Sequence, residues 1–64
     1  MSRKFGVSNG VIFRVGDWVE FRRPPPDKVY VLKEFLKEDY VELRGKDNPK
    51  DSAFCNLDAL RKVL

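Results

Sequence analysis

Residues 13–21, F-R-V-G-D-W-V-E-F, decide the fold class of this 64-residue chain. Gly16 tolerates a positive φ, and Asp17 can hydrogen-bond to the backbone beside it, so this dipeptide predicts a tight turn. On both sides of the turn, β-branched or aromatic side chains alternate with mostly polar ones at a period of two. A helix would need apolar residues at spacings of three and four. The stretch therefore predicts two strand segments, each with one buried face.

Residues 29–36 predict a second strand whose two faces are both apolar. Its alternation slips near Lys33, which is typical of a β-bulge in a curled sheet. Residues 37–39 predict a tight charged turn, and residues 40–44 predict a third strand. In this third strand Val41 and Leu43 are expected to point inward. The side chains expected to point outward are Tyr40, Glu42 and Arg44.

The end of the chain predicts short elements. Residues 47–49 form the turn signal Asp-Asn-Pro, and residues 52–55 predict a short fourth strand. Asn56 is expected to cap a single helical turn that runs through Leu60, because its side chain can accept hydrogen bonds from the first backbone N–H groups. Residues 61–64 predict a closing strand.

The N-terminal segment, residues 1–10, has two interpretations. Ser8-Asn9-Gly10 favours a type I′ turn, so the segment could supply an extra strand in a hairpin with the residues that follow Val11. The alternative is a tail, which we favour slightly because chain ends often fray.

Residues 22–28 predict a long loop. They include three prolines, which donate no backbone N–H and cannot lie in a central strand. These are Pro24, Pro25 and Pro26. The loop is either a stiff connector or a presented binding segment.

The order of these elements resembles the SH3-like small β-barrel, with five strands, a long first loop and one helical turn before the last strand. The resemblance covers Val11–Leu64 and rests on V-G-D-W-V at residues 15–19, E-D-Y-V-E-L at 38–43 and A-F-C-N-L-D-A-L-R-K-V at 53–63. It implies an all-β domain over residues 11–64. Similar layouts occur in KOW and Tudor-type domains, in a peripheral photosystem I subunit and in the variable chain of ferredoxin-thioredoxin reductase. These proteins differ in function, so the resemblance implies a fold and no chemistry.

Plasmid-borne type II dihydrofolate reductase is similar to this chain in G-D-x-V and in the ending A-L-x-x-V, here Ala59–Val63. That enzyme builds its central pore from a V-Q-I-Y motif in the preceding strand. The matching residues here, 52–55, read S-A-F-C. Since the motif is missing, neither the reductase activity nor the tetramer is expected of this chain.

Composition excludes several classes of site. The chain has no histidine and one cysteine, Cys55, so an internal disulfide, a cysteine metal cluster and a histidine-dependent triad are excluded. Cys55 follows Phe54 on a short strand and is expected to be a small core residue. We expect no catalytic residue, no metal and no cofactor. No apolar run approaches the ~20 residues of a membrane span, and we expect a cytoplasmic protein.

The net charge is +3, but acidic and basic residues are interleaved along the chain. Such a pattern is typical of a solvated surface, whereas phosphate-binding surfaces are clusters of one sign. Three aromatic residues, Trp18, Tyr30 and Tyr40, are expected on one exposed face, opposite Val19 and the other inward valines. The alternative is that Trp18 and Tyr30 close an open end of the barrel.

Two functions fit this pattern. The first is a non-catalytic protein-interaction module that docks a protein partner or another copy of itself, because tryptophan and tyrosine dominate binding hot spots. Its expected contacts are Trp18, Tyr30, Tyr40, Pro24, Pro25 and Pro26. The alternative is a KOW- or Tudor-like nucleic-acid-binding module, with aromatic side chains stacked on bases. Its expected phosphate contacts are Arg22, Arg23, Lys28, Arg44 and Lys46. The first interpretation is favoured because the barrel region is nearly neutral.

Overall fold

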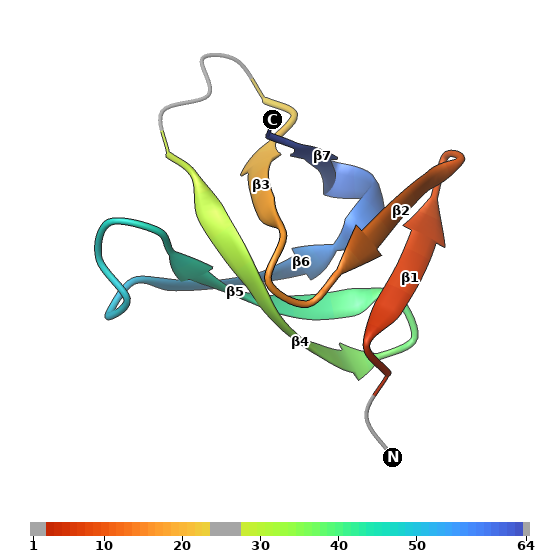
Figure 1. The fold of residues 1–64 in the computed structure, drawn as a ribbon, viewed down its shortest axis with the longest axis horizontal. Helices are drawn as coiled ribbons and strands as arrows, with labels where there is room; N and C mark the ends of the chain where they lie inside the picture. Colours follow the sequence, from red (N-terminus) through yellow and green to blue (C-terminus); the bar gives the residue numbers. More distant parts are fainter. Residues whose placement is uncertain (1–2, 24–27, 64) are drawn as a thin grey trace.

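The computed structural model describes residues 3–23 and 28–63 and confirms the predicted all-β class (Figure 1). Seven strands form two antiparallel sheets in the described residues. The smaller sheet pairs β1 (Phe5–Ser8) with β2 (Val11–Arg14). The larger has the order β6-β5-β4-β3-β7. Its strands are β3 (Trp18–Phe21), β4 (Tyr30–Lys37), β5 (Tyr40–Gly45), β6 (Ser52–Asn56) and β7 (Leu60–Lys62).

The β1–β2 hairpin contains one strand, β1, that the five-strand prediction does not include, whereas β2 overlaps the segment predicted before the Gly16-Asp17 turn. β1 pairs with β2 from Phe5 opposite Arg14 to Ser8 opposite Val11. Asn9 and Gly10 have φ angles of 51° and 77°, as the two central residues of a type I′ turn require. The preference for a tail was therefore wrong for Phe5–Ser8. The turn chemistry of Asn9-Gly10 outweighs the tendency of a chain end to fray.

The predicted turn at Gly16-Asp17 is confirmed, and it joins the two sheets. Gly16 has a φ of 99°, a conformation that favours glycine. The Asp17 N–H donates to the Arg14 carbonyl at 3.0 Å, and the Asp17 carboxylate accepts from the Arg14 N–H at 2.8 Å. The Gly16 N–H donates to the Leu32 carbonyl, and the Leu32 N–H donates to the Asp17 carbonyl. The turn is therefore bonded to the middle of β4.

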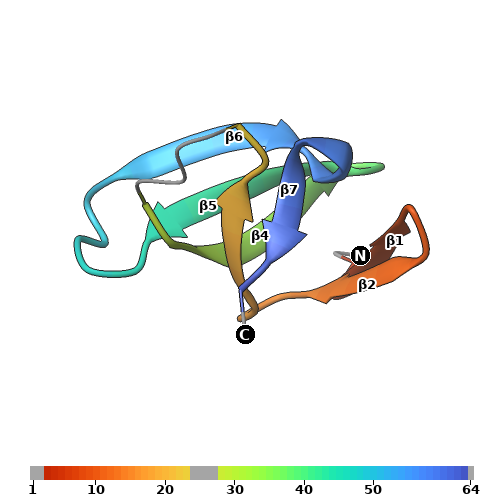
Figure 2. The same ribbon diagram turned by 90° about the horizontal axis from the view of Figure 1, so that it is seen from above.

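The larger sheet curls around β4. The register between β4 and β5 shifts between Leu32 and Glu34, which confirms the irregularity predicted near Lys33, and shifts again between Phe35 and Lys37. Irregularities of this kind bend a strand and increase its twist. In Figure 2, β3 and β7 run across the direction of β5 and β6, so the sheet folds over on itself.

A 3₁₀ turn, η1 (Leu57–Ala59), leads from β6 into β7. The predicted helical turn is confirmed, but the predicted cap is wrong, because the Asn56 side chain makes no capping hydrogen bond. The first N–H of the turn instead donates to the backbone: Leu57 N–H bonds to the Asp39 carbonyl at 2.9 Å. The closing strand begins at Leu60, one residue earlier than predicted.

The hydrophobic core lies between the curled sheet and the hairpin. Seven of its members come from the larger sheet and η1, and Phe13 comes from β2. They are Phe13, Val19, Leu32, Phe35, Val41, Leu43, Leu57 and Leu60. Gly6 is buried and packs against two of these core residues. A Cβ atom at this position would lie 2.8 Å from Phe35 Cε2 and 2.9 Å from Leu57 Cδ1. The hairpin therefore approaches the core too closely for a side chain at this position.

We predict that Gly6→Ala lowers the free energy of unfolding by about 1–3 kcal/mol, because the added methyl group overpacks the contact with Phe35 and Leu57. Urea denaturation measures this difference. Val7→Ala, on the opposite face of the same strand, is the control and should change stability by about 0.5 kcal/mol or less. Equal midpoints for Gly6→Ala and the unmodified protein would show that the hairpin does not pack on the core.

A second prediction concerns Asp17, whose Oδ2 lies 3.2 Å from Lys62 Nζ. Burial alone would raise the pKa of Asp17, but the Arg14 N–H bond and Lys62 together lower it below its usual 3.8. A lowered pKa means that the carboxylate stabilises the fold above pH 3.8 and that this contribution is lost as the pH falls further. Asp17→Asn should therefore cost about 1 kcal/mol at pH 7. Urea denaturation should show the difference shrinking as the pH falls below 3.8, and a pH-independent difference would contradict this account.

Candidate interaction surfaces

Trp18 lies on the outer face of the larger sheet and is exposed, as predicted. Its pairing partner is Val31 on β4, and Val31 in turn lies opposite Arg44 on β5. The Lys46 ammonium group is 4.4 Å from the centre of the indole ring, in a cation–π contact. The alternative in which Trp18 closes an end of the barrel therefore does not describe this residue.

Tyr30 faces the other way, and the expectation that it shares an exposed face with Trp18 was wrong. Tyr30 lies opposite Val19, is half-buried against the core and meets Phe21 edge-on at 5.5 Å between ring centres. Both faces of β4 are apolar in the sequence, so alternation alone does not decide which face is inward. The pairing of Leu32 with the buried Leu43 decides it and takes Tyr30 to the inner side.

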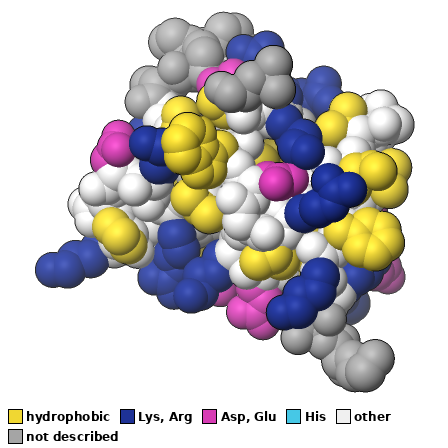
Figure 3. All heavy atoms as spheres, viewed as in Figure 1, with side chains coloured by type: hydrophobic (Ala, Val, Ile, Leu, Met, Phe, Trp, Pro, Cys, Tyr) yellow, Lys and Arg dark blue, Asp and Glu magenta, His cyan; other side chains and the backbone are white. Residues whose placement is uncertain are grey.

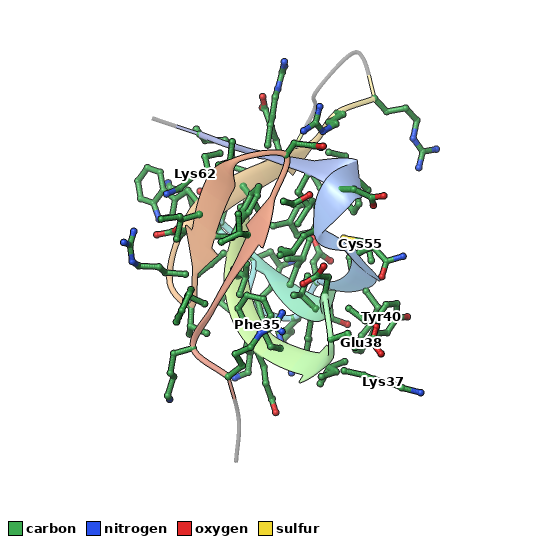
Figure 4. All side chains as sticks on the ribbon, turned by 90° about the vertical axis from the view of Figure 1, so that its right-hand side faces the viewer. Phe35, Lys37, Glu38, Tyr40, Cys55 and Lys62 are labelled. Carbon is green, nitrogen blue, oxygen red and sulfur yellow. The ribbon has the colours of Figure 1, made fainter. Side chains whose placement is uncertain are left out.

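Tyr40 is exposed on the outer face of β5, as predicted, but it lies far from Trp18. Trp18 is aligned through Val31 with Arg44 near the end of β5, whereas Tyr40 lies at the start of β5, opposite Lys37 and Asn56. Figure 4 shows Tyr40 beside Lys37 and Glu38, at the end of the molecule away from Lys62. The predicted single aromatic surface is therefore not formed.

Phe54 is a candidate that the sequence prediction missed. It is 51% exposed on the outer face of β6, and its ring stacks on Tyr40 with 6.4 Å between ring centres. Ser52, Phe54 and Asn56 are exposed, whereas Ala53 and Cys55 are half-buried. In the sequence, the small residues Ala53 and Cys55 alternate with Ser52, Phe54 and Asn56, and this alternation was the signal that could have placed Phe54 on the outer face.

Three of the five basic residues predicted to contact phosphates form salt bridges with carboxylates. The pairs are Arg44 with Glu42 at 2.9 Å, Lys28 with Asp51 at 3.0 Å and Lys46 with Asp47 at 3.7 Å. Each pair places a negative charge beside the positive one, which reduces the attraction for phosphate.

The other two basic residues, Arg22 and Arg23, follow β3. Arg22 Nε donates to the Leu60 carbonyl at 3.1 Å, and Arg23 is exposed. Pro24, Pro25 and Pro26 lie outside the described residues, so their predicted contact role stays a prediction.

The hairpin has an apolar outer face that was also missed. Phe5, Val7 and Ile12 lie on the side away from the buried Phe13, and they are 55%, 52% and 42% exposed. Arg14 lies opposite Phe5 on the same side. We call these four residues the hairpin face. In Figure 3, hydrophobic side chains gather at the right, where Figure 1 places β1 and β2, with Lys and Arg side chains beside them.

The hairpin also carries the excess charge of the chain. Residues 1–16 contain Arg3, Lys4 and Arg14 and no acidic residue, whereas the rest of the chain has ten basic and ten acidic residues. Arg3 binds Asp39 at 2.8 Å and lies over the Phe35 ring. Lys4 and Arg14 form no salt bridge with another described residue. Lys4, just before β1, and Arg14 on β2 are therefore exposed positive charges outside the salt bridges of these residues, although the Arg14 charge also contributes to the lowered pKa of the Asp17 carboxylate.

A groove of about 620 Å³ lies between the hairpin tip, the β4–β5 turn and the start of η1. Its lining is mostly polar and charged: Ser8, Lys37, Glu38, Asp39, Tyr40, Asn56 and Asp58. The described part of the chain contains no cluster of three or more residues that could hold a metal ion. It also contains no helix long and apolar enough to cross a membrane.

Cys55 is half-buried opposite Val41. Burial and the nearby Asp58 carboxylate raise the pKa of its thiol to about 11. A protonated thiol is a weak nucleophile, so at neutral pH this arrangement is that of a packing residue.

No protein-family model matches the chain, and no match was found among curated proteins or among solved structures.

We predict that Cys55 reacts with iodoacetamide at pH 8 roughly 100-fold more slowly than the urea-unfolded protein, because only the thiolate reacts and unfolding returns the pKa to about 8.5. The rate in the folded protein should increase about tenfold per pH unit up to pH 11, following the thiolate fraction. A plateau near pH 8.5 in the folded protein would contradict the raised pKa.

Proposed function

We propose that this chain is a non-catalytic protein-interaction module that binds its partner through the hairpin face. The observation that carries the proposal is that Phe5, Val7 and Ile12 share one side of a two-stranded sheet and stay about half exposed. Three large apolar side chains gathered on one face indicate a binding site more strongly than single exposed apolar residues do.

The charges around this face define the chemistry of the partner. Arg14 lies on the face, Lys4 directly precedes β1, and no acidic residue precedes Asp17 in the sequence. An apolar protein surface bordered by Asp or Glu side chains fits such a face, because opposite charges at the rim of an interface favour association and exclude basic partners. We infer a partner segment in which apolar and acidic residues alternate.

We further propose that the larger sheet is an SH3-like barrel that supports this hairpin. In support, the strand order β6-β5-β4-β3-β7, the irregular β4 and the 3₁₀ turn before β7 agree with the expected layout. In this arrangement Phe13 anchors the hairpin in the core, and the outer side of the hairpin is left for a partner. Trp18, exposed on a separate face, is a second candidate contact.

Nucleic-acid binding is the alternative function. Trp18 with Lys46 above its ring supports it, because an aromatic ring beside a basic side chain can stack on a base. The salt bridges of Lys28, Arg44 and Lys46 weigh against it, since each one neutralises a predicted phosphate contact. We therefore place protein binding first.

We predict that Ile12→Glu reduces partner binding at least about tenfold, because it places a negative charge in an apolar contact that faces acidic groups. The variants are immobilised, proteins captured from a lysate of the source cells are quantified by mass spectrometry, and the affinity of the leading candidate is then measured by calorimetry. Leu36→Glu is the matched control, with the same new charge on β4 of the other sheet, because Leu36 is 44% exposed and Ile12 is 42% exposed. Thermal unfolding establishes that both variants fold.

The same experiment separates the alternatives. Capture that survives Ile12→Glu but is lost in Trp18→Ala would move the site to the Trp18 surface and contradict the hairpin assignment. Fluorescence anisotropy with labelled single- and double-stranded oligonucleotides at low and moderate salt tests the nucleic-acid function. Binding that weakens steeply with salt would favour that function, because phosphate contacts release counterions.

A further inference from the structure

The two edge strands of the larger sheet differ in how they are protected against pairing. β7 has three residues, two of which form salt bridges: Arg61 with Glu20 at 2.7 Å and Lys62 with Asp17 at 3.2 Å. β6 has five residues, S-A-F-C-N, with no charge and no proline. Natural sheet edges are protected by short length, charged side chains or proline. β6 has none of these features, although 36% of the residues in the chain are charged.

The register shows which backbone groups of β6 are available. Leu57 N–H donates to the Asp39 carbonyl, and Gly45 N–H donates to the Asp51 carbonyl. Both pairs continue the β5–β6 register, in which hydrogen-bonded and non-hydrogen-bonded pairs alternate. Ala53 and Cys55 therefore bond to β5. The N–H and C=O groups of Ser52, Phe54 and Asn56 point away from β5, and β6 pairs with no other described strand.

We propose that β6 pairs in antiparallel fashion with β6 of a second copy of this chain, with Phe54 at the two-fold axis. In this register Phe54 lies opposite Phe54 of the second copy, and Ser52 lies opposite Asn56. Each outward N–H then meets an outward C=O, and the two larger sheets become continuous. A shift of the register leaves some of these outward groups without a partner, so the centred register is preferred.

Charge and side-chain placement favour a second copy of this chain as the partner that pairs with the β6 edge. When β6 pairs with β6 of a second copy, no like charges lie opposite one another, because the strand has no charged residue. Self-pairing of β7 would instead bring the positive charges of Arg61 and Lys62 together. The Phe54 rings meet on the outer face, next to the Tyr40 ring on which each one already stacks. Aromatic cross-strand pairs stabilise a sheet. Two five-residue strands bury less than a standard interface, so the dimer is weak and forms at high concentration.

This dimer uses an edge of the larger sheet, whereas the proposed partner site uses the hairpin face. The two proposals therefore share no residue, and each can fail alone.

Sedimentation equilibrium between 10 μM and 1 mM tests the pairing. The average mass should rise from 7.5 kDa towards twice that value. Phe54→Lys should weaken association at least tenfold, because lysine at an edge opposes pairing. Phe54→Pro should do the same without loss of the β5–β6 ladder, because the Phe54 N–H does not bond to β5. Ile12→Lys, the matched control on the hairpin face, should leave association unchanged.

Amide hydrogen exchange followed by NMR provides a second measurement on the unmodified protein. At low concentration the Ala53 and Cys55 amides should be protected, and the Phe54 and Asn56 amides should exchange rapidly. At high concentration protection should extend to Phe54 and Asn56. A mass of 7.5 kDa at every concentration, or a dimer that persists in Phe54→Lys and dissociates in Ile12→Lys, overturns the proposal.

Discussion

The Asp17 turn is the contact on which the two sheets depend. Its carboxylate accepts from the Arg14 N–H and pairs with Lys62 of β7, while its carbonyl accepts from Leu32 in the middle of β4. One residue therefore connects β2, β4 and β7. Because the turn leads from β2 of the smaller sheet directly into β3 of the larger one, the chain enters the core at Phe13 and again only six residues later at Val19.

The hairpin face follows from this packing. In a two-stranded sheet, residues on one strand alternate between the faces, so burial of Phe13 directs Ile12 and Arg14 outward. Gly6, opposite Phe13, permits the close approach that lets the hairpin cover Phe35. The same geometry that completes the core therefore leaves apolar side chains on the surface. These side chains lie outside the core, and the proposed partner would explain why so many of them are apolar.

Local chemistry explains which elements could be predicted from the sequence. The Gly16-Asp17 turn, the slip near Lys33 and the outward Tyr40 depend on neighbouring residues, and all three are confirmed. The inward side of Tyr30 depends on the pairing of β4 with β5, and the prominence of Phe54 depends on β6 lying at an edge. These are relations between distant segments, which periodicity within one segment does not contain.

The two proposed surfaces rely on different forces and lie on different sheets. The β6 edge offers backbone hydrogen bonds without charge, which suits a second copy, whereas the hairpin face offers apolar area beside positive charge, which does not suit self-pairing. A dimer formed at β6 would present two hairpin faces to one partner. Where the partner carries two acidic apolar segments that span both faces, the second contact becomes intramolecular, and weak single contacts combine into a stable complex.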